Sequence, residues 1–382
     1  MKKKTDIQLA SRDACTGCAA CASVCPTNSI TMRENKEGFL QPHIDADTCI
    51  CCHKCEKTCP IVTPITIPND FETHAYAAIN KDEAVRMRSS SGGMFHALAK
   101  WMIEQGGVVF GARFNEHWEV VHDYTETLEG IEPFMRSKYV QSRIGDTFQQ
   151  AKQFLDQGRQ VLFVGTPCQI GGLKSYLHKD YENLLAVDLI CHGVPSPKVW
   201  NKYLQEEFNT EVIKEINFRD KLDGWAREQK YTFTTSSSTR RFQNNSYCKG
   251  FINKIIIRRS CYKCAYRSSL GKTDIMLGDF WGVESNLPEM FDNRGTSLVF
   301  INSCKGMLFL HKLNSEDFQI KRLTKDSLKM AINANPSFEK QCEITPIHYI
   351  YFWLFSMLGY KATEWILLSK HLSKVCRLFN LK

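Results

Sequence analysis

Apolar and polar positions recur with two different periods in the middle of the chain. Ala75–Ile79 is a short apolar run typical of a strand, and residues 107–114 and 118–124 alternate like two paired strands. Apolar residues recur at helical spacing over Met94–Glu104 and over Thr147–Asp156. This part of the chain is therefore predicted to combine strands and helices in one domain.

Two strand–loop–helix units follow these elements. Gln160–Val164 is an apolar strand whose helix runs to about His178, and Leu184–Ile190 is a second whose helix runs to Phe208. Such units place their strands parallel, with the helices as crossovers on the sheet. Further strands are predicted at 212–218, 229–234, 255–259, 274–278 and 297–301. The expected fold class is α+β or α/β, with a mixed, partly parallel sheet and crossover helices.

From residue 345 the pattern changes to a strongly apolar helical tail. Its longest uncharged run, residues 349–360, is too short to span a bilayer. Lys361 and Glu364 interrupt the apolar pattern, and basic residues follow towards residue 382. The tail is either an interfacial helix on a membrane or a helix pair packed on the protein's own core or on a partner.

Composition narrows the class of protein. With 43% hydrophobic and 24% charged residues among 382, the chain is expected to be globular rather than disordered. Met1–Lys4 is basic but no apolar segment follows it, so we expect a cytoplasmic protein and not a secreted one. The 17 cysteines then indicate reducing conditions and metal sites.

The formal charge of +8 bears on the partners. It suits an acidic redox partner such as a small ferredoxin, or an anionic membrane surface. Nucleic acid is not expected, because the basic residues are scattered and no recognition motif accompanies them. A solvated basic surface without a partner is the alternative.

Cysteine spacing is the strongest chemical signal in the chain. The run C-x2-C-x2-C-x3-C-P occurs twice, beginning at Cys15 and at Cys49, as in bacterial-type ferredoxins with two [4Fe–4S] clusters. In that fold the fourth cysteine of each run ligates the other cluster. We therefore assign one cluster to Cys15, Cys18, Cys21 and Cys59, and the other to Cys49, Cys52, Cys55 and Cys25.

Two other readings of these cysteines fit less well. Structural zinc sites commonly use two separated CxxC pairs, and a disulfide framework needs an oxidising compartment. Cys51 interrupts the second run and is interpreted as a spare thiol, while residues 38–44 resemble a short ferredoxin hairpin. Residues 1–70 are expected to form the ferredoxin domain, ending in a proline-containing linker at 61–70.

A second group of cysteines lies further along the chain. Cys168 and Cys191 follow predicted parallel strands, at the strand ends where open α/β sheets build ligand sites, and Cys261 and Cys264 form a CxxC pair. The four thiols could converge on a third cubane. Spacing alone leaves zinc ligation and inert buried thiols as open alternatives.

Several motifs of this region resemble the family of coenzyme F420 hydrogenase/dehydrogenase beta subunits, over roughly residues 74–320. The motifs are 90–93, 137–142, 165–169, 191–193, 260–264 and 278–282. Residues 71–150 and 151–344 would be the two parts of that domain, followed by the tail at 345–382. The resemblance implies FAD and one [4Fe–4S] cluster, with Cys168, Cys191, Cys261 and Cys264 as its ligands.

The flavin would need donors and close backbone approach. The turn of Ser89, Ser90, Ser91, Gly92 and Gly93 before a predicted helix could approach a pyrophosphate or a flavin edge; the alternative is a plain serine N-cap.

Five other residues are candidates for flavin contacts: Lys138, Gln141, Ser142, Asp279 and Trp281. Their alternatives are a solvated lysine, strand residues and a core tryptophan. His192 is a candidate proton donor to a reduced substrate, or a loop residue bonded to backbone.

These expectations describe a flavin and iron–sulfur oxidoreductase. A ferredoxin-like donor would supply single electrons, and a flavin would deliver them in pairs to an organic small molecule. The alternative is an electron-transfer subunit that feeds a partner enzyme and has no substrate of its own. A third reading is a redox sensor or scaffold with structural clusters. Nothing in the sequence requires coenzyme F420 itself.

Overall fold

The structure is a computed structural model that describes residues 6–64, 71–225, 230–243, 245–267, 273–313, 316–338 and 341–367. The predicted linker falls partly outside these ranges, at 65–70, as does the end of the tail at 368–382. Within the described ranges, every helix is either too short or too polar to cross a bilayer.

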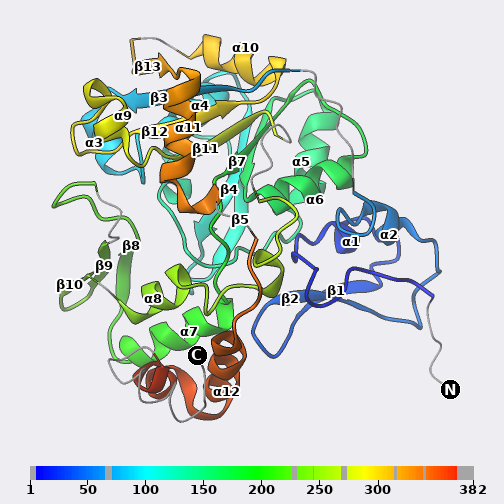
Figure 1. Cartoon of the computed structure of the whole chain (residues 1–382). Coiled ribbons are helices and arrows are strands. Elements are labelled where there is room, and N and C mark those ends of the chain that lie inside the picture. Colours follow the sequence, from blue (N-terminus) through cyan, green and yellow to red (C-terminus); the bar gives the residue numbers. More distant parts are fainter. Residues whose placement is uncertain are drawn as a thin grey trace.

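One eight-stranded sheet dominates the fold, in the order β13-β3-β12-β11-β7-β6-β4-β5 (Figure 1). Its strands are β3 (His74–Asn80), β4 (Val108–Phe114), β5 (Val120–Thr125), β6 (Val161–Gly165), β7 (Leu184–Leu189), β11 (Ile275–Asp279), β12 (Ser297–Ile301) and β13 (Phe318–Arg322). The central strands β4, β6, β7 and β11 are parallel, and the outer pairings are antiparallel. The predicted fold class, a mixed and partly parallel sheet, is confirmed.

Helices cover both faces of this sheet. Leu162 and Val164 of β6 pack in the same cluster as residues of α4 (Met94–Glu104) and α10 (Cys304–Lys312). Val161 and Phe163, which point the other way, pack with α5 (Thr147–Asp156) and α6 (Pro167–Leu177). Further along this second face, α11 (Lys325–Ala334) packs on β3, β11 and β12. Burial on both faces explains why the central strands are continuously apolar.

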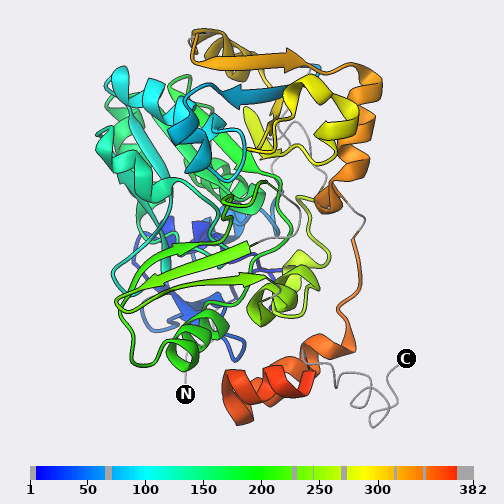
Figure 2. The same cartoon turned by 90° about the vertical axis from the view of Figure 1, so that its left-hand side faces the viewer.

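A smaller sheet, with strand order β10-β9-β8, forms a separate layer beside helices α7, α8 and α12 (Figure 2). These elements are β8 (Ile213–Asn217), β9 (Lys230–Thr235), β10 (Thr239–Gln243), α7 (Pro197–Glu207), α8 (Ser246–Ile252) and α12 (Pro346–Leu367). Their common core is aromatic and includes Trp200, Tyr203, Phe233, Tyr247 and Tyr351. The tail helix α12 therefore packs on the protein's own core, as one of the two alternatives predicted, and is kinked at Gly359.

The cysteine-rich N-terminal segment forms a compact layer against α5 and α6 (Figure 1). It contains α1 (Ala20–Ser23), α2 (Lys54–Thr58), β1 (Ile30–Glu34) and β2 (Leu40–Ile44), with β1 and β2 paired as an antiparallel hairpin. Cys18, Ala19 and Ala20 belong to the same core cluster as Phe148 of α5 and Leu173 of α6. This segment therefore shares a core with the large domain.

The shorter elements are α3 (Glu83–Met87), α9 (Val283–Asn286) and four 3₁₀ helices, η1 (Glu129–Phe134), η2 (Arg259–Cys261), η3 (Pro288–Met290) and η4 (Pro336–Phe338). The strand predicted at 255–259 is wrong: Ile257 makes a single bridge to Pro195, and η2 begins at Arg259. Its apolar side chains are buried in the aromatic core and do not line a sheet. The edge strands β10 and β13 were not predicted, because most of their residues are exposed and show no apolar alternation.

Candidate functional site

Two small cavities in the N-terminal segment are each lined by four cysteines. The first cavity, of about 350 Å³, is lined by Cys15, Cys18, Cys21 and Cys59. The second cavity, of about 320 Å³, is lined by Cys25, Cys49, Cys52 and Cys55. These are the two sets assigned from the spacing, including the exchange of the fourth cysteine between runs. Cys51 is exposed and does not line either cavity.

The backbone of these loops turns sharply so that the thiols face inward. Gly17 and Ala19 adopt positive φ values of 70° and 62°. In the second loop, Cys51 and His53 also have positive φ values, of 51° and 55°. A Cβ at Gly17 would also lie 2.6 Å from Nη1 of Arg258. Burial raises the pKa of Cys18 to about 11, so this thiol becomes a thiolate only beside a cationic centre such as bound iron.

A third cavity, of about 630 Å³, is lined by the second group of cysteines, Cys168, Cys191, Cys261 and Cys264. Cys168 lies in the first turn of α6, where Pro167 precedes it and the N–H of Thr166 donates to Gln169 Oε1 at 2.9 Å. Cys191 follows the end of β7. The tertiary structure thus brings together four thiols that come from three separate segments.

The cysteines of the third cavity are half-buried, and burial shifts the pKa values of three of them. Burial raises the pKa of Cys191 to about 12 and that of Cys261 to about 11, and it raises the pKa of Cys168 well above its usual range. Burial thus favours the neutral form of Cys168, Cys191 and Cys261. They fit a cationic metal centre, whose binding releases their protons.

A cubane and a zinc ion need different distances between their thiolates. Four thiolates on one zinc ion lie only about 3.8 Å apart, given a Zn–S bond of about 2.3 Å. Among the described residues, no three or more His, Cys, Asp or Glu side chains are grouped so as to hold a single metal ion. Cysteines set around a wider cavity fit a [4Fe–4S] cluster, which spreads its ligands over four irons.

The first and third cavities are neighbours. Thr16 lines both of them. On α6, a Cβ at Gly172 would lie 2.9 Å from Sγ of Cys18, and one at Gly171 would lie 2.4 Å from the hydroxyl of Tyr266, which itself lines the third cavity. Gly172 lets the helix that carries Cys168 touch the loop that carries Cys18, and Gly171 lets it approach the Tyr266 ring.

The turn from Ser89 to Gly93 is satisfied by the protein itself. Ser90 Oγ hydrogen-bonds Ser137 Oγ at 2.9 Å, and Ser91 Oγ donates to the carbonyl of Thr296. A Cβ at Gly92 would lie 2.2 Å from the carbonyl oxygen of Ala78. Gly92 is therefore explained by close packing on β3. The alternative of a serine N-cap is wrong, because Gly93 caps α4 without a side-chain bond.

Asp279 and Trp281 meet a segment that the sequence did not single out. Arg219 Nη1 lies 3.2 Å from Asp279 Oδ2, and its guanidinium lies over the Trp281 ring at 5.0 Å. Trp225 stacks on Trp281 with ring centroids 4.6 Å apart. Arg219 is buried, and its Nη2 has no hydrogen-bond partner in the part of the chain that is described. A buried guanidinium with a free donor beside stacked rings fits an anionic, aromatic ligand.

The other predicted residues are dispersed. Burial lowers the pKa of Lys138 to about 7, and its ammonium donates to the carbonyl of Met135 at 2.6 Å. Gln141 Nε2 donates to the carbonyl of Thr16, on the N-terminal segment, at 3.0 Å. Ser142 Oγ accepts from Gln169 Nε2 at 2.8 Å. Gln141 and Ser142 therefore position other segments of the protein.

His192 occupies the loop between Cys191 and Gly193 but is not among the residues that line the third cavity. Its Nε2 lies 3.1 Å from the carbonyl of Ile252, and its ring contacts Phe251 edge-on. These contacts match the alternative of a loop residue bonded to backbone and do not favour a role as proton donor.

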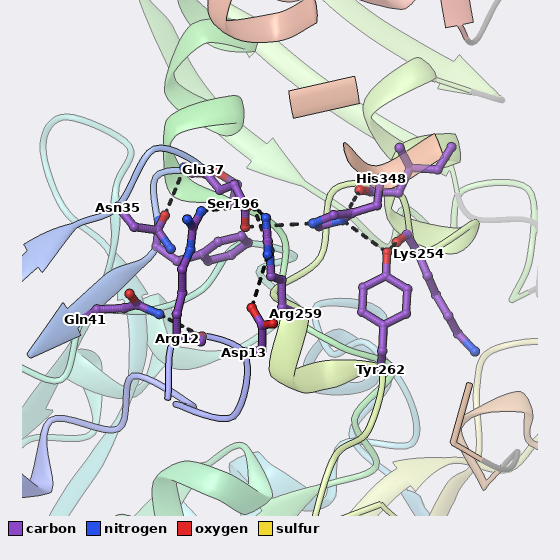
Figure 3. A network of polar contacts seen from close by, with 12 residues as sticks. Arg12, Asp13, Asn35, Glu37, Gln41, Ser196, Lys254, Arg259, Tyr262 and His348 are labelled. Carbon is purple, nitrogen blue, oxygen red and sulfur yellow. Dashed lines mark hydrogen bonds and ion pairs between the residues drawn. The ribbon is translucent and has the colours of Figure 1, made fainter. Parts of the chain in front are cut away.

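A buried network joins the N-terminal segment to the large domain (Figure 3). Glu37 forms an ion pair with Arg259, and its Oε2 lies 3.8 Å from Nε2 of His348, on the tail helix. Its backbone carbonyl accepts from Ser196 at 2.5 Å. Burial alone would raise the pKa of Glu37, but contacts with His348 and Arg259 outweigh it and lower the pKa to about 2. We call this set the docking network.

Arg258 makes a second set of contacts across the same boundary. It is 2% exposed, and it donates to the carbonyls of Cys15 at 2.7 Å and Leu40 at 2.9 Å. It also donates to Gln141 Oε1 at 3.0 Å. Arg258 lines the third cavity as well, so one side chain links the first cysteine loop to the third cysteine group.

Comparison with known proteins identifies two regions of the chain. Residues 158–326 match the family described as the C terminus of the coenzyme F420 hydrogenase/dehydrogenase beta subunit, and residues 14–62 match the 4Fe-4S dicluster domain. The predicted resemblance is therefore confirmed.

Two curated relatives are similar over part of their length. A subunit of the F(420)H(2) dehydrogenase of Methanosarcina mazei is 24% identical over 225 residues, which cover 56% of this chain and 62% of the relative. Coenzyme F420-dependent sulfite reductase of Methanocaldococcus jannaschii is 26% identical over 214 residues, which cover 54% of this chain and 32% of the relative. The chain thus spans less than two thirds of either relative.

Among solved structures, a chain of the F420-reducing [NiFe] hydrogenase complex from Methanosarcina barkeri matches with a TM-score of 0.46 and 16% identity. The match covers 73% of this chain and 99% of that chain.

Proposed function

Residues 158–326 are a C-terminal domain of the coenzyme F420 hydrogenase/dehydrogenase beta-subunit type, joined to a 4Fe-4S dicluster domain at residues 14–62, and from this we propose an iron–sulfur oxidoreductase. It takes single electrons from a redox partner such as a ferredoxin. It passes them, through a flavin, to an organic small molecule.

The observation that carries this proposal is the arrangement of twelve cysteines around three cavities, with Thr16 common to the first and the third. Bound [4Fe–4S] clusters would supply one-electron transfer at these positions. The protein's own residues gather the thiols around the cavities and pack α6 against the Cys18 loop at Gly172. Cofactors placed as near neighbours in this way suit electron transfer, since the protein's part is to orient them.

FAD is the finer part of the proposal. When bound, it would supply the conversion between single electrons and a hydride. The residues that fit it best are Arg219, whose Nη2 has no partner among the residues that the structure describes, and the Trp225–Trp281 stack beside Asp279. The Ser89–Gly93 turn fits less well, because Ser90 and Ser91 already hydrogen-bond within the protein.

A second candidate function is an electron-transfer subunit without a small-molecule substrate. The name of the Methanosarcina mazei relative favours it, because that protein is a subunit of an F(420)H(2) dehydrogenase. A stable complex with a partner enzyme, together with no turnover of small molecules by the isolated chain, would select this candidate.

The test is the content of iron, sulfide and flavin per chain in anaerobically isolated protein. The wild type should hold about twelve irons and one flavin, and the double variant Cys261→Ala/Cys264→Ala about eight irons. Cys51→Ala is the matched control, because this thiol is exposed and lines none of the three cavities. Full iron without flavin, and without affinity for added flavin, would remove FAD and favour the electron-transfer subunit.

We also propose that the outer face of α12 makes peripheral contact with an anionic membrane. Trp353 and Trp365 of α12 are 57% and 66% exposed, whereas Tyr351, Phe355 and Tyr360 of the same element are buried. The sequence that follows, 368–382, carries four lysines and arginines and no acidic residue. Aromatic side chains beside basic ones suit the headgroup region.

The membrane proposal is tested by sedimentation with vesicles. The chain should bind vesicles that contain phosphatidylglycerol and not vesicles of phosphatidylcholine alone. Trp353→Ser with Trp365→Ser should weaken this binding. No binding to either vesicle would leave the face to a protein partner.

A further inference from the structure

Arg267 carries two buried donors without an acceptor. The residue follows Cys264 by three positions and lines the third cavity. Its Nη2 donates to the carbonyl of Cys261 at 2.9 Å and lies 3.5 Å from that of His192. Its Nε and Nη1 are shielded from solvent and have no hydrogen-bond partner among the described residues. The side chain is thus anchored at one nitrogen, with two donors left over.

Such an arrangement is costly unless a ligand accepts the donors. A buried donor left without a partner destabilises the folded protein, and more so when it belongs to a charged group. Among the described residues that line the third cavity there is no aspartate or glutamate that could neutralise Arg267. The cavity wall offers the four cysteine sulfurs as the main soft acceptors.

Arg258 provides an internal comparison. It lines the same cavity, but its Nε, Nη1 and Nη2 donate to Cys15, Gln141 and Leu40. Its hydrogen-bonding capacity is therefore directed to the N-terminal segment. Of the two arginines at this cavity, Arg267 is the one with donors free for a bound group. Among the described residues, neither the first nor the second cavity is lined by an arginine.

We propose that Arg267 donates one of its two unpaired N–H groups to a sulfur atom of the centre held by Cys168, Cys191, Cys261 and Cys264, and thereby raises its reduction potential. The inference rests on the proposed function, which places a [4Fe–4S] cluster at these thiols. One-electron reduction adds one negative charge to the centre, and it breaks no bond and needs no proton. A fixed positive charge and N–H donors to sulfur stabilise the more negative, reduced form. Arg267 therefore adjusts the reduction potential of the centre without being one of its ligands.

The experiment is a redox titration of the anaerobically isolated full chain, with dithionite as the one-electron reductant. The third centre is followed by electron paramagnetic resonance and identified by its absence in Cys261→Ala/Cys264→Ala. Arg267→Gln should shift the midpoint potential of this centre to more negative values and leave the other two unchanged. Arg113→Gln is the control, because Arg113 pairs with Asp123 and lines none of the three cavities.

Iron content separates failure of the inference from failure of the proposed function. A wild-type chain with only about eight irons would remove the third centre itself, and with it the premise. Twelve irons and an unchanged potential in Arg267→Gln would overturn the role of Arg267 alone. If Arg267→Gln does not retain the centre, Arg267→Lys decides: it keeps the charge but loses the planar guanidinium donors, so a shift to more negative potential than the wild type supports the inference and no shift overturns it.

Discussion

Replacing Arg258 by methionine should loosen the N-terminal segment from the large domain. Methionine fills most of the space of the arginine stem but donates no hydrogen bond. The substitution leaves the buried carbonyls of Cys15 and Leu40, and the side chain of Gln141, without their donor.

The size of the effect follows from these contacts. A hydrogen bond to a charged group contributes about 1.5–3 kcal/mol. Gln141 can turn to another partner, so the two backbone carbonyls set the loss at about 3–6 kcal/mol. At about 1.4 kcal/mol per factor of ten, the lower bound is already more than a hundredfold in the equilibrium between docked and undocked forms.

Hydrogen exchange followed by mass spectrometry measures this equilibrium on the full, iron-loaded chain. Amides of the β1–β2 hairpin, 30–44, should exchange faster in Arg258→Met than in the wild type by that factor, because exchange reports local opening. Arg241→Met is the matched control, since Arg241 pairs with Asp220 in the small sheet. Exchange of the hairpin within about threefold of wild type would show that Arg258 does not hold the segment in place.

Three further predictions test the other contacts. Gly172→Ala places a methyl group 2.9 Å from Cys18 Sγ and should lower the free energy of unfolding, measured in urea, by about 1–3 kcal/mol. The control Ser175→Ala, on the same helix, removes a buried hydroxyl that has no partner among the described residues, and should leave that free energy nearly unchanged. Glu37→Gln leaves Arg259 with the more exposed Asp13 as its carboxylate partner. It should cost about 1.5–3 kcal/mol of docking, read from the same hairpin amides. Because the folded pKa of about 2 lies below the unfolded value, the contribution of the Glu37 carboxylate is complete above about pH 4.5 and is lost as the pH falls towards 2. In the folded protein the pKa of Lys138 is about 7. Between about pH 7 and 10 only the unfolded chain still holds that proton, so stability should rise with pH, and the urea midpoint should rise less steeply in Lys138→Met. An equal rise in wild type and variant would contradict the assignment.

Local spacing made the cysteine ligand sets predictable. Three of the four thiols of each ferredoxin cavity come from one short loop, so their approach depends on backbone geometry within about ten residues. The central strands and their crossover helices were also predictable, because burial on both faces imposes continuous apolar runs. The role of each cysteine as a ligand remains a prediction that the iron content tests.

Edge elements carried no such signal. Four of the five residues of β13 are exposed, and β10 is only intermittently covered, so their strand structure follows from pairing with β3 and β9 and not from an apolar pattern. The strand predicted at 255–259 was wrong for the opposite reason. Its apolar residues are buried as expected, but they pack in an aromatic core and not in a sheet. A short apolar run alone does not distinguish a strand from a buried loop.

By itself, then, the sequence determined the chemistry that lies within short segments: two cysteine runs, a CxxC pair and the strands that precede Cys168 and Cys191. Only the tertiary structure decided which groups meet across the chain. Arg258 reaches the carbonyl of Cys15 over a separation of 243 residues. Packing also leaves Nη2 of Arg219, and Nε and Nη1 of Arg267, without a partner in the described ranges of the chain. The physical reason is that burial and hydrogen-bond satisfaction are properties of the whole packed structure, which no local pattern encodes.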